Sequence, residues 1–148
     1  MRDGPRQVTV LARDEAMRRL GSVGLGRIVF TERALPAVRL ASHIVDEGRI
    51  IIRSDEGAVI GNPSDIDGTV VAYEADAVDP KSHLGWTVTV TGVARVVDDP
   101  HQVARYQKMV RPWAAGDRDC TIRIGAEIVT GFELASEPSG RVPQGPQA

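Results

Sequence analysis

The stretch from Pro36 to Gly57 constrains the fold of this chain most strongly, because it has the pattern of two strands joined by a tight turn. Residues Ala37–Val45 are mostly apolar, and Arg49–Ser54 contain three consecutive isoleucines, which favour strands. The sequence Asp46-Glu47-Gly48 separates the two runs, and its glycine can take a positive φ at little cost. The pattern predicts an antiparallel β-hairpin.

The longest strand pattern lies later in the chain, at Trp86–Val97. Its first half alternates strictly between apolar residues and threonines, which is typical of a half-buried strand. Gly92 interrupts the run and indicates a bulge or bend of the kind that a barrel needs. Shorter patterns predict further strands at residues 26–31, 69–75, 120–124 and 127–134.

Two short helices complete the expected elements. Residues 13–20 carry acidic side chains in the first turn and arginines in the last, which complements the helix dipole. A second helix begins after Asp99, followed by Pro100 at the first helical position. Six or seven strands with two short helices predict a mainly β fold, either a barrel or a strongly bent sheet whose openings the helices cover.

The composition narrows the class of protein. The chain has 148 residues, of which 42% are apolar and 26% are charged, as in ordinary globular domains. A net charge of −2 does not favour sequence-independent binding of nucleic acid or attachment to a membrane surface. The single Cys120 excludes a disulfide within the chain and a cysteine zinc cluster, and the three histidines have no metal-ligand spacing.

Sequence patterning predicts one folded domain with a loose segment on each side. We expect a flexible lead over residues 1–10, a folded domain over residues 11–135, and a disordered tail over residues 136–148 that is rich in Pro, Gly, Ser and Gln. The first residues contain no apolar signal sequence, and no run approaches the roughly 20 apolar residues that span a bilayer. We therefore expect a cytoplasmic protein.

The end of the predicted hairpin carries the clearest chemistry. Arg53 and Ser54 stand side by side and are followed by a turn that contains Gly57. A guanidinium, a hydroxyl and free turn amides are the donors that hold a phosphate group. On the residues alone, an Arg-Ser pair at a strand end is usually a solvated strand edge.

The order of these segments resembles that of the pyridoxamine 5′-phosphate oxidase-like proteins, in particular their small FMN-binding split-barrel members. The resemblance covers residues 11–134 and is carried by the hairpin ending in Arg53-Ser54, the run from Gly85 to Gly92, and the closing Ile128-Val129-Thr130-Gly131. It implies a six-stranded antiparallel split barrel that forms a homodimer, with cofactor sites at the subunit interfaces.

The resemblance also implies which residues hold the cofactor. Arg53 and Ser54, with Gly57 in the turn, would bind the FMN phosphate, while Ser42 and His43 on the preceding strand would line the rest of the flavin. For His43 the alternative is a partly buried histidine whose ring bonds a backbone carbonyl. A late Trp and Arg supplied by the partner subunit in such proteins correspond to Trp113 and Arg118.

One departure from the family pattern leaves two functions open. Many relatives carry a Lys shortly after the glycine turn, where this chain has Val59, so one charged phosphate contact is missing. The first hypothesis is an oxidoreductase that uses FMN or a deazaflavin on a small molecule. The second is a binding module that holds flavin, deazaflavin or haem on the same fold without turnover.

Overall fold

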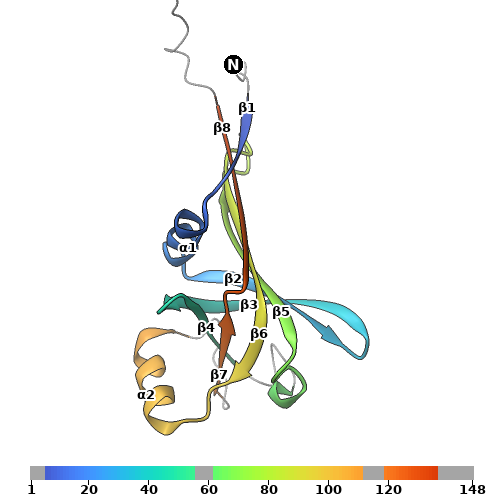
Figure 1. The fold of residues 1–148 in the computed structure, drawn as a ribbon, viewed down its shortest axis with the longest axis vertical. Helices are drawn as coiled ribbons and strands as arrows, with labels where there is room; N and C mark the ends of the chain where they lie inside the picture. The colour runs from blue at the N-terminus through green and yellow to red at the C-terminus, as the bar shows by residue number, and fades with distance from the viewer. Residues whose placement is uncertain (1–5, 56–61, 112–118, 137–148) are drawn as a thin grey trace, which may run out of the picture.

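The structure is a computed structural model that describes residues 6–55, 62–111 and 119–136. Figure 1 shows the strands of the sheet, with both helices on the left of the view, one above the other. The elements in chain order are β1 (Arg6–Val10), α1 (Arg13–Gly21), β2 (Leu25–Glu32), β3 (Leu35–Asp46), β4 (Arg49–Asp55), the 3₁₀ helix η2 (Pro63–Asp65), β5 (Val70–Val78), β6 (Gly85–Val96), α2 (Pro100–Met109), β7 (Asp119–Gly125) and β8 (Ile128–Ser136).

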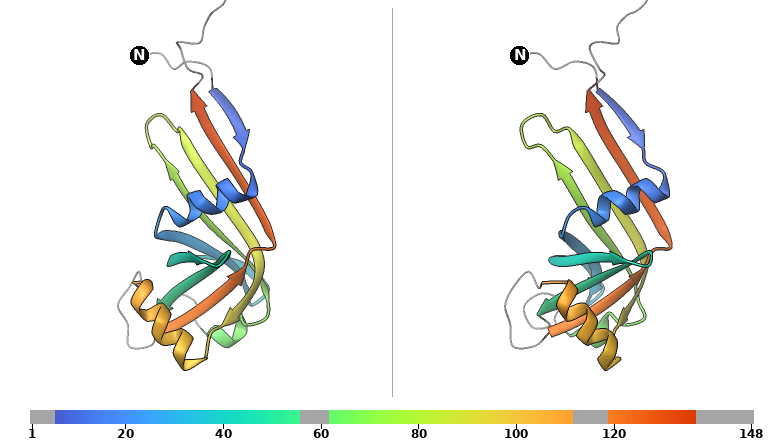
Figure 2. Two further views of the ribbon diagram at one scale, coloured as in Figure 1. Left: turned by 60° about the vertical axis from the view of Figure 1, so that its left-hand side comes forward. Right: turned by 90° about the vertical axis from the view of Figure 1, so that its left-hand side faces the viewer.

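Six of the strands close into a barrel. The order β6-β5-β2-β3-β4-β7 returns to β6, and every pairing is antiparallel. Strands β8 and β1 continue the sheet beyond the barrel along the first half of β6 (Figures 1 and 2). The predicted mainly β class and the six-stranded split barrel are therefore confirmed.

Gly92 marks the place where the barrel splits. Strand β6 pairs with β8 up to Thr91 and with β7 from Ala94 onward, so it changes partner around this glycine. A Cβ atom built on Gly92 would lie 1.7 Å from the carbonyl oxygen of Gly125, where β7 ends. Only a residue without a side chain allows this close approach of two backbones.

Tight turns join the first three barrel strands. In the β3–β4 turn, Glu47 and Gly48 take φ of 52° and 74°, so the predicted turn is confirmed. In the β2–β3 turn, Arg33 and Ala34 take φ of 53° and 66°. Strand β3 begins at Leu35, two residues before the start at Ala37 that the sequence predicts, because Arg33 and Ala34 alone form the turn.

The core lies inside the barrel and under α1. Apolar side chains from the inner faces of the strands fill it, including Ile50 and Ile52 of β4 and Val88 and Val90 of β6. Helix α1 crosses the sheet and adds Ala16 and Leu20, both fully buried (Figure 2). Trp86 and Cys120 also belong to this core.

Ordered structure begins earlier than the sequence predicts. Residues 6–10, assigned to the flexible lead, form β1, which pairs with β8 from Arg6 opposite Ser136 to Val10 opposite Phe132. Because β8 runs past the barrel, it presents an unpaired edge, and β1 satisfies the backbone groups of that edge. Ser136, assigned to the tail, is the last residue of β8.

Helix α2 is attached to the barrel through polar contacts and through a small apolar cluster of Ile51, Tyr106 and Val110. The side chain of Asp99 accepts a hydrogen bond from the Gln102 amide at 3.2 Å, which confirms the predicted start of the helix. Arg105 donates two hydrogen bonds to Asp46 at 3.0 and 3.1 Å, and the Tyr106 hydroxyl donates a third at 2.9 Å. These donors, the Arg105 guanidinium first, hold the pKa of the Asp46 carboxyl below its ordinary value.

No helix in the described residues is long and apolar enough to cross a membrane. Within the same residues, no group of three or more His, Cys, Asp or Glu side chains could hold a metal ion.

Candidate functional site

Ser42, Arg53 and Thr121 form a buried polar row across three neighbouring strands. Ser42 on β3 pairs with Arg53 on β4, which pairs in turn with Thr121 on β7. Side chains alternate along a strand, and Ile50 and Ile52 face the core, so Arg53 lies on the outer face of the barrel. Even so, the three polar residues are only 3–9% exposed.

Helix α2 covers Arg53. Its Nη1 donates hydrogen bonds to the carbonyl oxygens of Gln107 at 3.0 Å and of Val110 at 2.5 Å, at the end of the helix. The carbonyls at a helix C-terminus lack intrahelical donors and carry partial negative charge, so a cation there is favourable. Arg53, predicted as a phosphate donor, therefore also caps the C-terminal end of α2.

His43 is embedded in the core. It is 2% exposed, its Nε2 lies 2.8 Å from the Leu20 carbonyl oxygen, and its Nδ1 lies 2.6 Å from the Tyr73 hydroxyl. Burial lowers the pKa of its imidazole, so the ring is neutral near pH 7. This geometry is that of the alternative given above, a buried histidine bonded to a backbone carbonyl.

The remaining predicted site residues are only partly visible. The backbone of Ser54 pairs with Cys120, but the Ser54 side chain lies outside what the structure describes. Gly57, Trp113 and Arg118 lie outside the described residues altogether. Their roles stay predictions from the sequence resemblance.

A cavity of about 450 Å³, here called the β7 cavity, lies beside the polar row. Thr121 and Cys120 of β7 line it, and their pairing partners are Arg53 and Ser54. The other described lining residues come from η2, the end of β6, and α2: Asn62, Pro63, Ser64, Asp67, Val96, Val97, Asp98 and Val103.

Thr121 is the polar residue that sequence reasoning missed. Its Oγ1 is buried and has no hydrogen-bond partner among the described residues. The alternation Cys120, Ile122, Ile124 is a signal that could have found it, because it places Thr121 on the face opposite the core.

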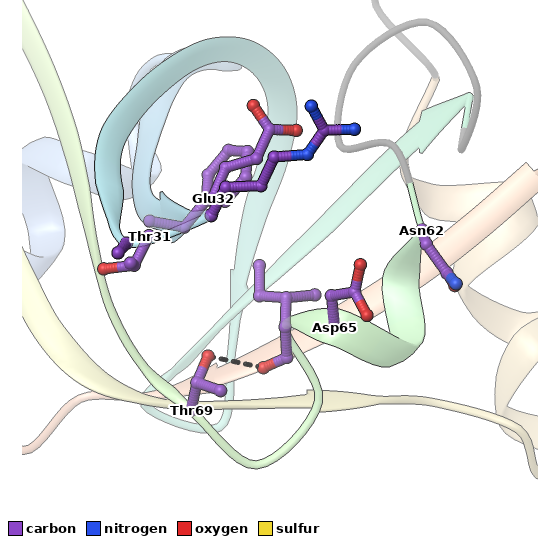
Figure 3. A pocket seen from close by; sticks show the side chains of 9 residues that line it. Thr31, Glu32, Asn62, Asp65 and Thr69 are labelled. Atoms are coloured by element: carbon purple, nitrogen blue, oxygen red, sulfur yellow. Dashed lines mark hydrogen bonds between the residues drawn. The ribbon is translucent and has the colours of Figure 1, made fainter.

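A second hollow, the hairpin pocket, has about 550 Å³ and lies between the β2–β3 turn and η2. Phe30 and Ile66 line it together with the polar residues labelled in Figure 3. The figure shows the Asp65 carboxylate directed into the pocket, whereas the Asn62 amide is directed away. With Glu32 also on its wall, this pocket presents two carboxylates and one guanidinium, that of Arg33, and so does not favour an anion.

A charged cluster on the outer face of β2 and β5 was also not predicted. Arg27 Nη1 lies 3.2 Å from Glu74 Oε1 and 3.5 Å from Asp76 Oδ2. Burial, and then the neighbouring Asp76 carboxyl, raise the pKa of Glu74. Arg27 is more than forty residues from Glu74 and Asp76 in the sequence, so no local motif predicts the cluster.

The fold defines the class: a split-barrel protein, here with a buried polar row on the outside of the barrel. Comparison with known families matches residues 12–138 to the family described as pyridoxamine 5′-phosphate oxidase. The chain belongs to this family, which confirms the resemblance inferred from its sequence.

Individual relatives agree with this assignment. An uncharacterized protein of Mycobacterium tuberculosis, Rv0080, is 48% identical over 135 residues, which is 89% of each chain. A solved putative pyridoxamine 5′-phosphate oxidase from Corynebacterium glutamicum is 29% identical with a TM-score of 0.72, over 93% of this chain and 100% of that one. An FAD-binding protein from Mycobacterium smegmatis is 28% identical with a TM-score of 0.68, over 86% of this chain and 99% of that one.

Proposed function

We propose that this chain is a flavin-binding split-barrel oxidoreductase that holds FMN on the outer face of the barrel, beside Ser42 and Arg53. The observation that carries the proposal is the buried Arg53 guanidinium, which is paired with Ser42 and lies one strand from the β7 cavity. A flavin is supported by the solved FAD-binding relative, and FMN by the motif resemblance.

The described residues fit such a cofactor. Binding pockets for ligands of this size are about 300–1,000 Å³, and the β7 cavity lies within that range. Arg53 would supply a charge-assisted donor for the phosphate, with Ser54 and the Gly57 turn next to it in sequence. Ser42 and Thr121 would supply hydroxyl groups on either side of Arg53.

The division of labour follows from these contacts. A bound flavin would supply the hydride or two-electron transfer, and the chain would supply binding, orientation and exclusion of water. Arg53 and Ser42 belong to adjacent barrel strands that are hydrogen-bonded in register, so the scaffold fixes their spacing. His43 would act from behind this surface, through the position of β3, because its two ring nitrogens are already bonded within the core.

The alternative function is a binding module without turnover. Val59 favours it, because the position that carries a charged phosphate donor in many relatives is apolar here. Weaker phosphate binding would also reduce the preference for FMN, so that a deazaflavin or haem could be the bound molecule.

The absorption spectrum of the freshly purified protein tests the cofactor class, since flavin, deazaflavin and haem have distinct bands. We expect flavin bands that bleach anaerobically with NADH or NADPH and return when an electron acceptor is added. A flavin spectrum that neither nucleotide, nor dithionite followed by an acceptor, can cycle would favour the binding module. A protein that binds no flavin, even when flavin is added in excess, would contradict the proposal.

A further inference from the structure

We infer that Thr121 is a ligand-contacting residue whose hydroxyl bonds the uncharged part of the cofactor inside the β7 cavity. This inference rests on the proposed function and extends it, because it assigns different parts of the ligand to different residues of the polar row. Arg53 would face the anionic end, and Thr121 the hydroxyl-bearing chain or the ring edge.

The unsatisfied hydroxyl of Thr121 is the first observation behind this assignment. Thr121 is 3% exposed, and its Oγ1 has no hydrogen-bond partner within the described part of the chain. Its backbone is satisfied, because its carbonyl oxygen accepts a hydrogen bond from the Val97 amide at 2.9 Å. Leaving a buried hydroxyl unbonded is unfavourable. A bound molecule would supply the hydrogen-bond partner that the Thr121 hydroxyl lacks.

The charge on the cavity wall is the second observation. Its described lining contains the carboxylates of Asp67 and Asp98 and the polar groups of Asn62 and Ser64, but no Lys or Arg. Asp67 is fixed in place, because its Oδ1 accepts a hydrogen bond from the Val96 amide at 2.9 Å. Two carboxylates repel a phosphate and accept hydrogen bonds from hydroxyl or amine groups. The cavity therefore suits an uncharged, donor-rich part of a ligand.

The spacing of the strands connects the two ends of the site. Arg53 and Thr121 are paired on adjacent strands, and paired strands lie about 4.8 Å apart. One molecule with an anionic end and a hydroxyl-bearing chain can therefore reach both residues. A flavin mononucleotide has this layout, and riboflavin has the chain and ring without the phosphate.

Substitution of Thr121 separates a ligand contact from a packing role. Thr121→Val removes the hydroxyl and keeps the shape, and Thr121→Ser keeps the hydroxyl and serves as the matched control. We expect Thr121→Val to weaken binding of FMN and of riboflavin by the same factor, about three- to tenfold. We expect Thr121→Ser to stay within about twofold of the wild type. The ligand-free Thr121→Val protein should melt at the wild-type temperature or a few degrees higher, because an unbonded buried hydroxyl has been removed.

Three results would overturn the inference while leaving the proposed function intact. Thr121→Val could bind both flavins as tightly as the wild type does. It could lose affinity for FMN alone, which would place the phosphate at Thr121. It could melt several degrees lower without ligand, which would show that the hydroxyl is bonded within the protein. Failure of the wild type to bind either flavin would instead refute the proposed function, and the inference with it.

Discussion

At the scale of single residues, His43 joins three parts of the fold. Its Nε2 must carry the proton of the neutral ring, because the Leu20 carbonyl oxygen beside it can only accept. The single proton of the Tyr73 hydroxyl then faces two acceptors, the unprotonated Nδ1 at 2.6 Å and the Ala41 carbonyl oxygen at 2.9 Å. The ring thus links the end of α1 to β3 and β5, and a second proton would have to enter a buried site.

This environment predicts a loss of stability in mild acid. Burial lowers the pKa of His43 in the folded chain, so the unfolded chain, with an ordinary pKa of about 6.5, takes up the proton first. The contribution is fully present above about pH 6.5 and is lost as the pH falls toward the folded pKa, by at most about 1.4 kcal/mol per pH unit. Melting temperatures between pH 7.5 and 5.5 measure it.

Variants assign this loss to one histidine. His43→Gln cannot titrate, so its melting temperature should vary less with pH than that of the wild type, whatever its absolute stability. His83 is exposed and provides the control, since His83→Gln should keep the wild-type pH dependence. Equal pH dependence in the two variants would show that the loss arises elsewhere.

The sequence predicts a site residue only where the residues that mark it are neighbours in the chain. Arg53 stood out because it adjoins Ser54 and a glycine turn, all within five residues. Its bonds to the carbonyls of Gln107 and Val110 were not predictable, because those residues lie more than fifty positions away. The sequence likewise could not show that the Thr121 hydroxyl lacks a hydrogen-bond partner, since hydrogen bonding of a side chain depends on the packed structure.

At the scale of elements, Gly92 decides whether the barrel can split. The alternation of β6 and the interruption at Gly92 were both readable, and the strand and its special position were predicted from them. The change of pairing partner from β8 to β7 could not be predicted from the sequence. Periodicity shows which face of the sheet a residue occupies but not which strand lies beside it.

We expect Gly92→Ala to destabilise the protein by about 3 kcal/mol or more, because its Cβ would collide with the backbone of Gly125 rather than with a movable side chain. Gly24 is the matched control, since a Cβ there would have no heavy atom within 4 Å. Gly24→Ala should change the free energy of unfolding by no more than about 0.5 kcal/mol. Urea denaturation of both variants gives the comparison, and similar midpoints would refute the close approach.

For helix α2, the sequence predicts the start of the element but not its packing. Its start at Asp99 was predictable from a local cap. Its attachment depends on Asp46 and Arg53, which come from strands formed much earlier in the chain. The sequence therefore predicts that the helix exists but not that it covers the polar row.

At the scale of the whole molecule, one face of the β1–β8 extension stays apolar and exposed. Val8, Val10, Ile128 and Phe132 are 45–72% exposed. Val10 pairs with Phe132, and strand alternation places all four on the face opposite α1, which packs against Gly131. Exposed apolar surface of this kind is typical of an interface, and the family resemblance predicts a homodimer.

We expect the wild type to have the mass of a dimer by light scattering at micromolar concentration. Val10→Asp should shift the mass toward that of a monomer, because it buries a charge in the proposed interface. Thr9→Asp, on the other face of the same strand, should remain a dimer. A wild-type monomer, or equal behaviour of the two variants, would argue against this interface.

The overall architecture was predictable to a greater degree than its assembly. Strand patterns and the family resemblance predicted the barrel, which the structure confirms. A second subunit, a cofactor or a substrate would contact surface residues, and no core imposes a regular side-chain pattern on those residues. They therefore stand as proposals.

Titration of the wild type and Arg53→Ala with FMN and with riboflavin tests the central claim most directly. A charge-assisted contact contributes roughly 1.5–3 kcal/mol, so Arg53→Ala should weaken FMN binding about ten- to a hundredfold. Riboflavin has no phosphate, so its affinity should fall much less than that of FMN. Any loss for riboflavin would reflect only the loosening of α2, which Arg53 bonds and whose Val103 lines the β7 cavity. Equal weakening of both ligands would show that Arg53 acts only through the fold, and the absence of flavin binding by the wild type would contradict the account as a whole.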